Sequence, residues 1–189
     1  MNTTMNGQSF AQQQVLALLS RHVVGNEADA AAQAEFIAFA AGHPDCCERT
    51  LAAGHFTGSA WLVSADGKRV LLTHHRKLNR WLQLGGHADG DGDLAAVALR
   101  EAEEESGLSR LMVEGGIFDL DRHLIPARGS EPAHWHHDVR FVVRATDDEY
   151  FVANEESNEL AWRSIGELAD DGAMDESLRR MAVRWLQRA

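Results

Sequence analysis

The sequence has little cysteine, and it contains no long apolar run. Its two cysteines, Cys46 and Cys47, are adjacent, so they are poorly placed to bridge each other and they match no C-x-x-C spacing. We therefore expect reduced thiols. No apolar stretch approaches the roughly 20 residues of a transmembrane helix, and the first ten residues lack the basic start and apolar stretch of a secretory signal. These absences predict no membrane partner and a cytoplasmic location.

Basic residues are also scarce. The chain has 18 Lys and Arg against 29 Asp and Glu, which gives a formal net charge of -11. Nonspecific binding to a nucleic-acid backbone draws its affinity from Lys and Arg that neutralise phosphates. We therefore expect no nucleic-acid duplex as a partner. Anionic small molecules are not excluded, because bound divalent cations reverse the local sign of a site.

The chain has the composition of a folded globular protein. It has 189 residues, of which 44% are apolar and 25% are charged. Helical spacing of apolar residues predicts one helix over 9–24 and a second over 29–41. No low-complexity linker follows them, so residues 1–50 are predicted to be a helical extension packed on the main domain.

After residue 55 the pattern changes to short strand-like runs separated by Gly, Asp and Lys. One strongly marked helix is predicted over 93–106, with further strands after it and a last helix over 176–187. Strands on both sides of one helix, with helices at the ends, indicate an α/β fold in which a mixed sheet lies between helices.

The most informative stretch, residues 85–108, is a glycine-rich acidic loop that leads into the predicted helix. At about 100° per residue, Glu101, Glu104 and Glu105 fall within one arc of the helix. Carboxylates at this spacing repel one another, and a divalent cation offsets that repulsion. A solvated acidic face is the alternative for the glutamates alone. The glycine loop and Arg100 directly before Glu101 favour the cation site.

Residues 86–108 resemble the Nudix box, G-x5-E-x7-R-E-U-x-E-E-x-G-U, in which U is a bulky aliphatic residue. The positions that fit are Gly86, Arg100, Glu101, Glu104, Glu105, Gly107 and Leu108, with Ala102 as a small substitute at one U position. One position departs from the pattern, because Gly92 stands where the family has a glutamate that braces the arginine. Asp89, Asp91 and Asp93 are the candidates to take over that contact to Arg100.

The resemblance implies a Nudix-type α/β/α sandwich over residues 51–189, with residues 1–50 outside it. It implies Mg²⁺ (or Mn²⁺) as the cofactor. The implied metal ligands are Gly86 through its carbonyl, Glu101, Glu104 and Glu105. Catalytic roles fall to Arg100, Glu101 and Glu105, with Arg100 orienting Glu101. Glu101 is the first candidate for the general base, and Glu155, Glu156 and Glu159 are the reserves.

Four further side chains are candidates for substrate binding: His87 in the glycine loop, Arg76 and Arg80 in a basic run, and His136. A basic hairpin tip is an equal alternative for the two arginines. The run HWHHDVRF also suggests a transition-metal site, since imidazole and carboxylate suit Zn²⁺ or Ni²⁺. Strand alternation places His134 and His136 on one face and His137 on the other. Side chains on opposite faces cannot all bind one ion, so a substrate-lining role or plain exposure is favoured over a zinc site.

The resemblance implies hydrolysis of a pyrophosphate linkage in a nucleoside diphosphate derivative or a related organic diphosphate. One alternative is a noncatalytic Nudix-like sensor of a nucleotide or ADP-ribose, which Gly92 leaves open. Another is an enzyme like isopentenyl-diphosphate isomerase, which needs a suitably placed cysteine, whereas Cys46 and Cys47 precede the strands. The expected partner is a small-molecule diphosphate, and a homodimer is left open.

Overall fold

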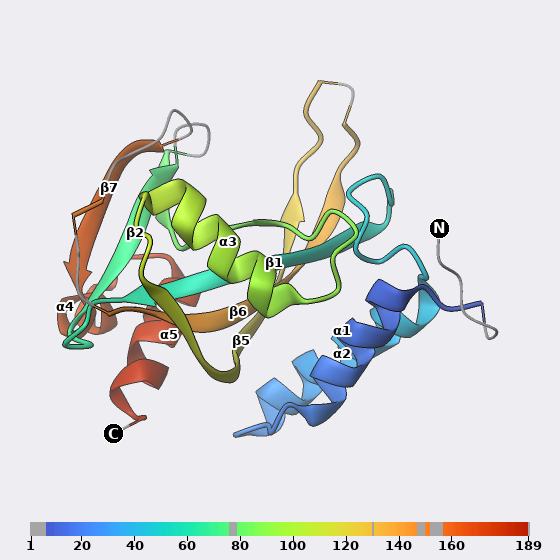
Figure 1. Cartoon of the computed structure of the whole chain (residues 1–189), viewed down its shortest axis with the longest axis horizontal. Helices are drawn as coiled ribbons and strands as arrows, with labels where there is room; N and C mark the ends of the chain where they lie inside the picture. Colours follow the sequence, from blue (N-terminus) through green and yellow to red (C-terminus); the bar gives the residue numbers. More distant parts are fainter. Residues whose placement is uncertain (1–6, 76–78, 130, 147–149, 152–156, 189) are drawn as a thin grey trace. The chain divides into compact units, whose positions relative to one another are not determined.

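The computed structural model describes residues 7–75, 79–129, 131–146, 150–151 and 157–188 (Figure 1). Its helices are α1 (Phe10–Arg21), α2 (Glu27–Gly42), α3 (Leu94–Ser106), α4 (Ile165–Asp170) and α5 (Glu176–Leu186). Its strands are β1 (Gly54–Val63), β2 (Arg69–His75), β3 (Arg80–Leu82), β4 (Leu84–His87), β5 (Leu111–Ile125), β6 (His134–Ala145) and β7 (Ser157–Ser164). The chain is thus an α/β protein, as its sequence predicts.

The strands form one sheet in the order β3-β2-β1-β6-β5, with β4 paired to β1 and β7 paired to β2. Strand β2 runs antiparallel to β1, β3 and β7. Besides β2, strand β1 has β4 and β6 as neighbours. Histidines on β1, β4 and β6 can therefore lie close together.

The described chain divides into two compact units. The first unit comprises Met1–Gly58, Gly86–Val97 and Gly116–Arg140, and the second comprises Ser59–Gly85, Ala98–Gly115 and Phe141–Ala189. The domain boundary expected at residue 50 stays a prediction.

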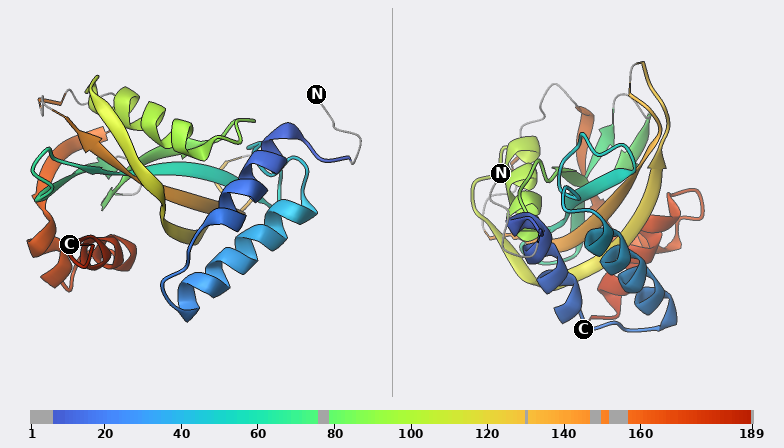
Figure 2. Two further views of the ribbon diagram at one scale, coloured as in Figure 1. Left: turned by 60° about the horizontal axis from the view of Figure 1, so that its bottom comes forward. Right: turned by 90° about the vertical axis from the view of Figure 1, so that its right-hand side faces the viewer.

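In the first unit, helices α1 and α2 lie side by side (Figures 1 and 2). Ser9 caps α1, since its hydroxyl accepts the N–H of Gln12 at 3.1 Å. The side chain of Gln12 donates to the carbonyl of Ala40 at 2.7 Å and is buried. A buried amide that bonds to the neighbouring helix fixes the pairing of the two helices. The N-terminal helical pair is confirmed.

The second unit has an apolar core that includes one face of α3. This core comprises Ala60, Leu62, Leu71, Leu84, Ala102, Leu108, Val143 and Leu160. Ala102, the small residue at an aliphatic box position, is fully buried there. In the same unit α4 packs on α5 (Figure 2). The sequence pattern does not predict α4, because its six residues are too few for helical periodicity.

None of the described helices combines the length and apolarity needed to span a membrane.

Candidate active site

Helix α3 begins and ends where the sequence predicts. The carboxylate of Asp93 accepts the N–H of Ala96 at 3.1 Å and caps the first turn. At the other end Gly107 adopts a φ of 71° and donates its N–H to the carbonyl of Glu103 at 2.8 Å. A left-handed glycine is the usual helix terminator. These two ends fix the segment that carries Arg100 and the box glutamates.

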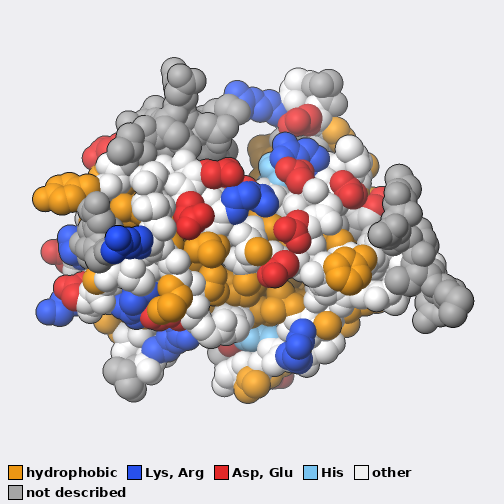
Figure 3. All heavy atoms as spheres, in the orientation of Figure 1, with side chains coloured by type: hydrophobic (Ala, Val, Ile, Leu, Met, Phe, Trp, Pro, Cys, Tyr) orange, Lys and Arg blue, Asp and Glu red, His pale blue; other side chains and the backbone are white. Residues whose placement is uncertain are grey.

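Arg100 lies between two of the box carboxylates. Its Nη2 atom is 3.0 Å from Oε1 of Glu101, and its Nε atom is 3.9 Å from Oε1 of Glu104. The Glu101 side chain is 19% exposed and that of Glu104 is 63% exposed. Charged side chains gather over and beside α3 in Figure 3. The arginine therefore holds the partly covered glutamate, while Glu104 faces solvent.

The third box carboxylate is tied to the chain before the box. Oε1 of Glu105 accepts the backbone N–H of Gly85 at 2.9 Å. Gly85 lies so close to Ser59 that a Cβ atom would stand 2.2 Å from its hydroxyl oxygen. Glycine is therefore required at residue 85, and its N–H fixes the Glu105 carboxylate.

The donor set of α3 fits Mg²⁺ or Mn²⁺ in its chemistry, because carboxylate oxygens are the hard ligands that these cations take. Within the described residues, the three glutamates are not a group whose ligand atoms all lie within 4.8 Å of one another. Mg²⁺ is commonly held by one or two carboxylates, with water and substrate phosphate oxygens in the remaining positions. Two of the glutamates suffice for such a site.

The structure accounts for Gly92 in place of the family's glutamate. A Cβ atom at residue 92 would lie 2.4 Å from the carbonyl oxygen of Ala11 and 2.6 Å from its Cα atom. The contact is with backbone, which cannot swing aside as a flexible side chain can. Helix α1 therefore occupies the space that any side chain at residue 92 would need.

The three aspartates proposed to replace that glutamate have partners within the first unit. The carboxylate of Asp89 forms an ion pair with Arg49. Asp91 accepts the N–H of Asp93 at 2.9 Å, and Asp93 caps α3. Whether one of them braces Arg100 stays a prediction, as does the metal role of the Gly86 carbonyl.

Only one of the two arginines proposed for substrate binding is among the described residues. Arg76 lies outside the described residues. Arg80 is at the start of β3, and its side chain is 51% exposed and 3.6 Å from a carboxylate oxygen of Asp175. Among the reserve bases, Glu155 and Glu156 also lie outside the described residues, and Glu159 is exposed on β7. Their proposed roles stay predictions.

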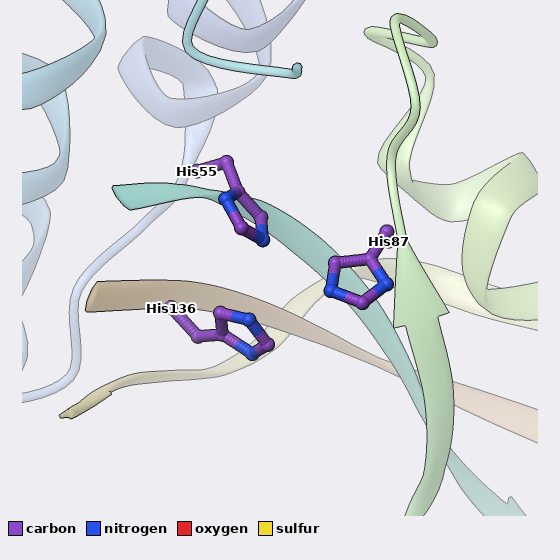
Figure 4. A group of neighbouring side chains, drawn as sticks. All are labelled: His55, His87 and His136. Atoms are coloured by element: carbon purple, nitrogen blue, oxygen red, sulfur yellow. The ribbon is translucent and has the colours of Figure 1, made fainter. Parts of the chain in front are cut away.

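The structure brings His87 and His136 together, and it adds His55, which the sequence analysis missed (Figure 4). One ligand atom from each residue lies within 4.8 Å of the other two. His55 is 1% exposed, and within the described part of the chain neither of its ring nitrogens has a hydrogen-bond partner. A histidine at the start of a strand gives no sequence signal of such a neighbourhood, because its partners lie 32 and 81 residues away along the chain.

The expected alternation of the histidines on β6 is confirmed. His137 stacks on Phe39 of α2 with ring centroids 3.8 Å apart, and it also contacts Phe36 and Phe56. His134 and His136 instead contact the ring of His55. Plain exposure is wrong for His137, which is 3% exposed because it packs among aromatic side chains.

Comparison with known proteins identifies the family. The model of the NUDIX domain matches residues 55–185, which is more than half of the chain. The chain therefore belongs to the Nudix family, and the resemblance carried by residues 86–108 is confirmed.

Individual relatives are more distant. The chain is 32% identical over 99 residues to the Xenopus laevis m7GpppN-mRNA hydrolase NUDT17, a match that covers 48% of this chain and spans a third (33%) of that relative's length. Among solved structures it is similar to the MutT protein of Methanosarcina mazei, with 18% identity, a TM-score of 0.54, and coverage of 71% of this chain and 94% of that chain. It is also similar to a UDP-X diphosphatase, with 16% identity, a TM-score of 0.51, and coverage of 93% and 92%. These structures show the fold.

Proposed function

We propose that the chain hydrolyses a pyrophosphate linkage in a nucleoside diphosphate derivative or a related organic diphosphate, with Mg²⁺ or Mn²⁺ as cofactor. The observation that carries this proposal is the arrangement on α3, where Arg100 contacts Glu101 at 3.0 Å and Glu104 at 3.9 Å. Family membership supports the reaction class. The arginine holds two carboxylates close together on one face of the helix, and carboxylate oxygens so grouped are the ligands that a hard divalent cation takes.

Each α3 residue has a distinct proposed role. Glu104 is exposed and so presents its oxygens to a cation, while Glu105 is fixed by the N–H of Gly85. Glu101 is the proposed general base, because it is the carboxylate that Arg100 orients directly. The proposed metal ligands are Glu101, Glu104, Glu105 and the carbonyl of Gly86.

A bound divalent cation supplies charge neutralisation on the diphosphate and lowers the pKa of a coordinated water. The chain itself then contributes position and charge rather than covalent chemistry. His87, Arg80, Arg76 and His136 are the proposed substrate contacts. The leaving portion of the substrate is not specified by α3, because the box residues contact only diphosphate and metal.

The departure at Gly92 does not favour a noncatalytic sensor. A Cβ atom there would meet the backbone of Ala11, so the glycine is explained by packing in the first unit. The loss of a bracing carboxylate is a consequence of that packing, whereas Arg100 and its glutamates are all present.

The proposal is tested by a hydrolysis screen with Mg²⁺ or Mn²⁺. The compounds include a UDP-linked diphosphate and an m7GpppN cap, which represent the substrates that similar proteins are named for. ADP-ribose, a dinucleoside polyphosphate and an oxidised nucleotide complete the set. We expect turnover of at least one compound and a loss of about 100-fold or more in kcat for Glu104→Gln, because a charge-stabilising group is removed.

Glu103→Gln is the matched control, since it removes one charge from the same helix at a residue that the box does not use. We expect its kcat to stay within about twofold of the wild-type value. Equal turnover by Glu104→Gln and the wild type would refute the role of Glu104. Tight binding of a nucleotide without turnover by the wild type would favour the sensor instead.

A further inference from the structure

Three strands bring three imidazole rings to one point within the first unit. His55 is on β1, His87 ends β4 and His136 is on β6, and both β4 and β6 neighbour β1. The N–H of Ala88 donates to the carbonyl of Phe56 at 3.3 Å, which sets His87 beside His55. Figure 4 shows the three rings turned toward one another. Pairing of the strands, rather than a local motif, creates the cluster.

The separations of the rings suit ligation of one ion. The ring centroid of His55 lies 5.0 Å from that of His87 and 4.7 Å from that of His136. The centroids of His87 and His136 are 5.1 Å apart. Their ligand atoms lie within 4.8 Å of one another. Two nitrogens on one Zn²⁺ lie at most about 4.2 Å apart, twice the Zn–N distance. Small movements of the rings are therefore enough to bind a single ion.

The environment of His55 is the most direct indication of a metal-binding site. His55 is 1% exposed, and neither of its ring nitrogens has a hydrogen-bond partner among the residues that the structure describes. Burial of a polar group without a partner costs free energy. A metal ion bound to the ring nitrogen that carries the lone pair offsets part of that cost, because this nitrogen then has a partner.

The protonation of the rings agrees with this geometry. Burial, together with the neighbouring histidines, lowers the pKa of His55 to about 4 and that of His136 to about 2. Burial also lowers the pKa of His87. Neutral imidazole is the form that binds a metal ion.

We infer that His55, His87 and His136 form a binding site for a divalent transition metal, with Zn²⁺ the first candidate and a fourth position open to water. An all-imidazole donor set suits Zn²⁺, Cu²⁺, Ni²⁺ and Fe²⁺ rather than Mg²⁺, which takes oxygen ligands. Three protein ligands with one open position are typical of zinc sites that bind an exchangeable water. This site is chemically different from the carboxylates of α3. With an ion bound, the ligating nitrogens of His87 and His136 are no longer available to contact a substrate, so the metal role replaces the direct contacts proposed for them above.

His134 supports the ring of His136 from outside the three ligands. Its Nδ1 atom lies 3.0 Å from the carbonyl oxygen of Pro132, which only accepts, so Nδ1 is the donor in this hydrogen bond. Its Nε2 atom lies 3.3 Å from Nε2 of His136. Partners of this kind orient metal-binding histidines in known metal sites.

The test measures zinc and cobalt binding by the full chain, without any activity assay. Apo-protein is titrated with Zn²⁺ against a chromophoric chelator, and with Co²⁺ by visible absorption. We expect one Zn²⁺ per chain, retained in Glu104→Gln. We expect affinity about 100-fold lower or worse for His55→Ala and for His136→Ala, because even the loss of a supporting partner costs 10–100-fold.

His22→Gln is the control, since it removes a histidine of the first unit that lies at the end of α1, and we expect its zinc affinity to be unchanged. Circular dichroism and thermal unfolding, with and without Zn²⁺, distinguish loss of binding from loss of fold. Wild-type protein should gain thermal stability with Zn²⁺, and a folded His55→Ala should not. Equal zinc affinity in wild type and folded His55→Ala, or loss of zinc in Glu104→Gln, would overturn the site.

Discussion

The two candidate metal sites differ in how the chain builds them. The carboxylates of Glu101, Glu104 and Glu105 come from just over one turn of a single helix and are partly or largely exposed. The imidazoles of His55, His87 and His136 come from three strands and are buried or half-buried. A local site is set by helical spacing, whereas a non-local site depends on the pairing of strands. The first is visible in a sequence and the second is not.

The supports of the two sites differ as well. On α3 the arginine beside the glutamates is Arg100, whose side chain is 41% exposed. In the strands of the first unit the comparable residue is Arg140, whose side chain is 2% exposed. A buried charge has a structural cost and an exposed charge has almost none. We therefore expect Arg140 to matter for stability and Arg100 to matter for chemistry.

The largest predicted effect is the destabilisation caused by Arg140→Leu. Arg140 lies 2.7 Å from Asp138, 3.1 Å from Asp119 and 3.2 Å from Asp121, so it joins β5 to β6. Its removal takes away the buried positive charge that faces the buried carboxylates of Asp119 and Asp138. We expect the free energy of unfolding to fall by about 3–5 kcal/mol, as measured by urea denaturation.

Arg144→Leu is the matched control on the same strand, β6. Arg144 pairs with Glu114 in the second unit, and its side chain is 23% exposed. A partly exposed pair contributes about 1 kcal/mol or less, so this variant should lose far less stability. Equal losses in the two variants would remove the distinction between a fully buried network and a partly exposed ion pair.

The next prediction concerns Gly92, which lies in the loop before α3. The Gly92→Ala variant places a methyl group against the backbone of Ala11, and overpacking of this kind costs about 1–3 kcal/mol. We expect a lower midpoint in urea. Gly116→Ala is the control, because a Cβ atom there meets no atom of the described residues within 4 Å. An unchanged midpoint for Gly92→Ala would mean that α1 does not need this close approach.

The same residue shows what sequence could and could not reveal. The ends of α3 at Asp93 and Gly107 were predictable, because caps and terminators act within a few residues. The reason for Gly92 was not, since its neighbour Ala11 is 81 residues earlier in the chain. A glutamate placed at residue 92 would meet the same backbone atoms of Ala11, so the brace seen in the family pattern does not fit beside α1.

The histidines also show that a sequence predicts local features better than contacts between distant segments. Alternation along β6 was enough to separate His136 from His137, because side chains on a strand point to opposite faces in turn. Alternation cannot say which strand lies next to which. His55 lies beside His87 and His136 because β1 pairs with β4 and β6. A search for closely spaced ligands within one stretch of sequence could not include it.

The smallest predicted effect is that of Arg100→Gln, which tests the carboxylates of α3 separately from the histidine cluster. We expect Arg100→Gln to lower kcat by about tenfold, which corresponds to about 1.4 kcal/mol, because Glu101 loses the partner 3.0 Å away that orients it. Arg100→Lys should restore part of the rate, since it keeps the charge but not the planar geometry. Because Arg100 is 41% exposed, the midpoint in urea should stay near the wild-type value, and zinc affinity should not change. A variant that lost stability or zinc instead of kcat would mean that the two sites are not independent, and that the division between a local catalytic helix and a non-local metal site does not hold.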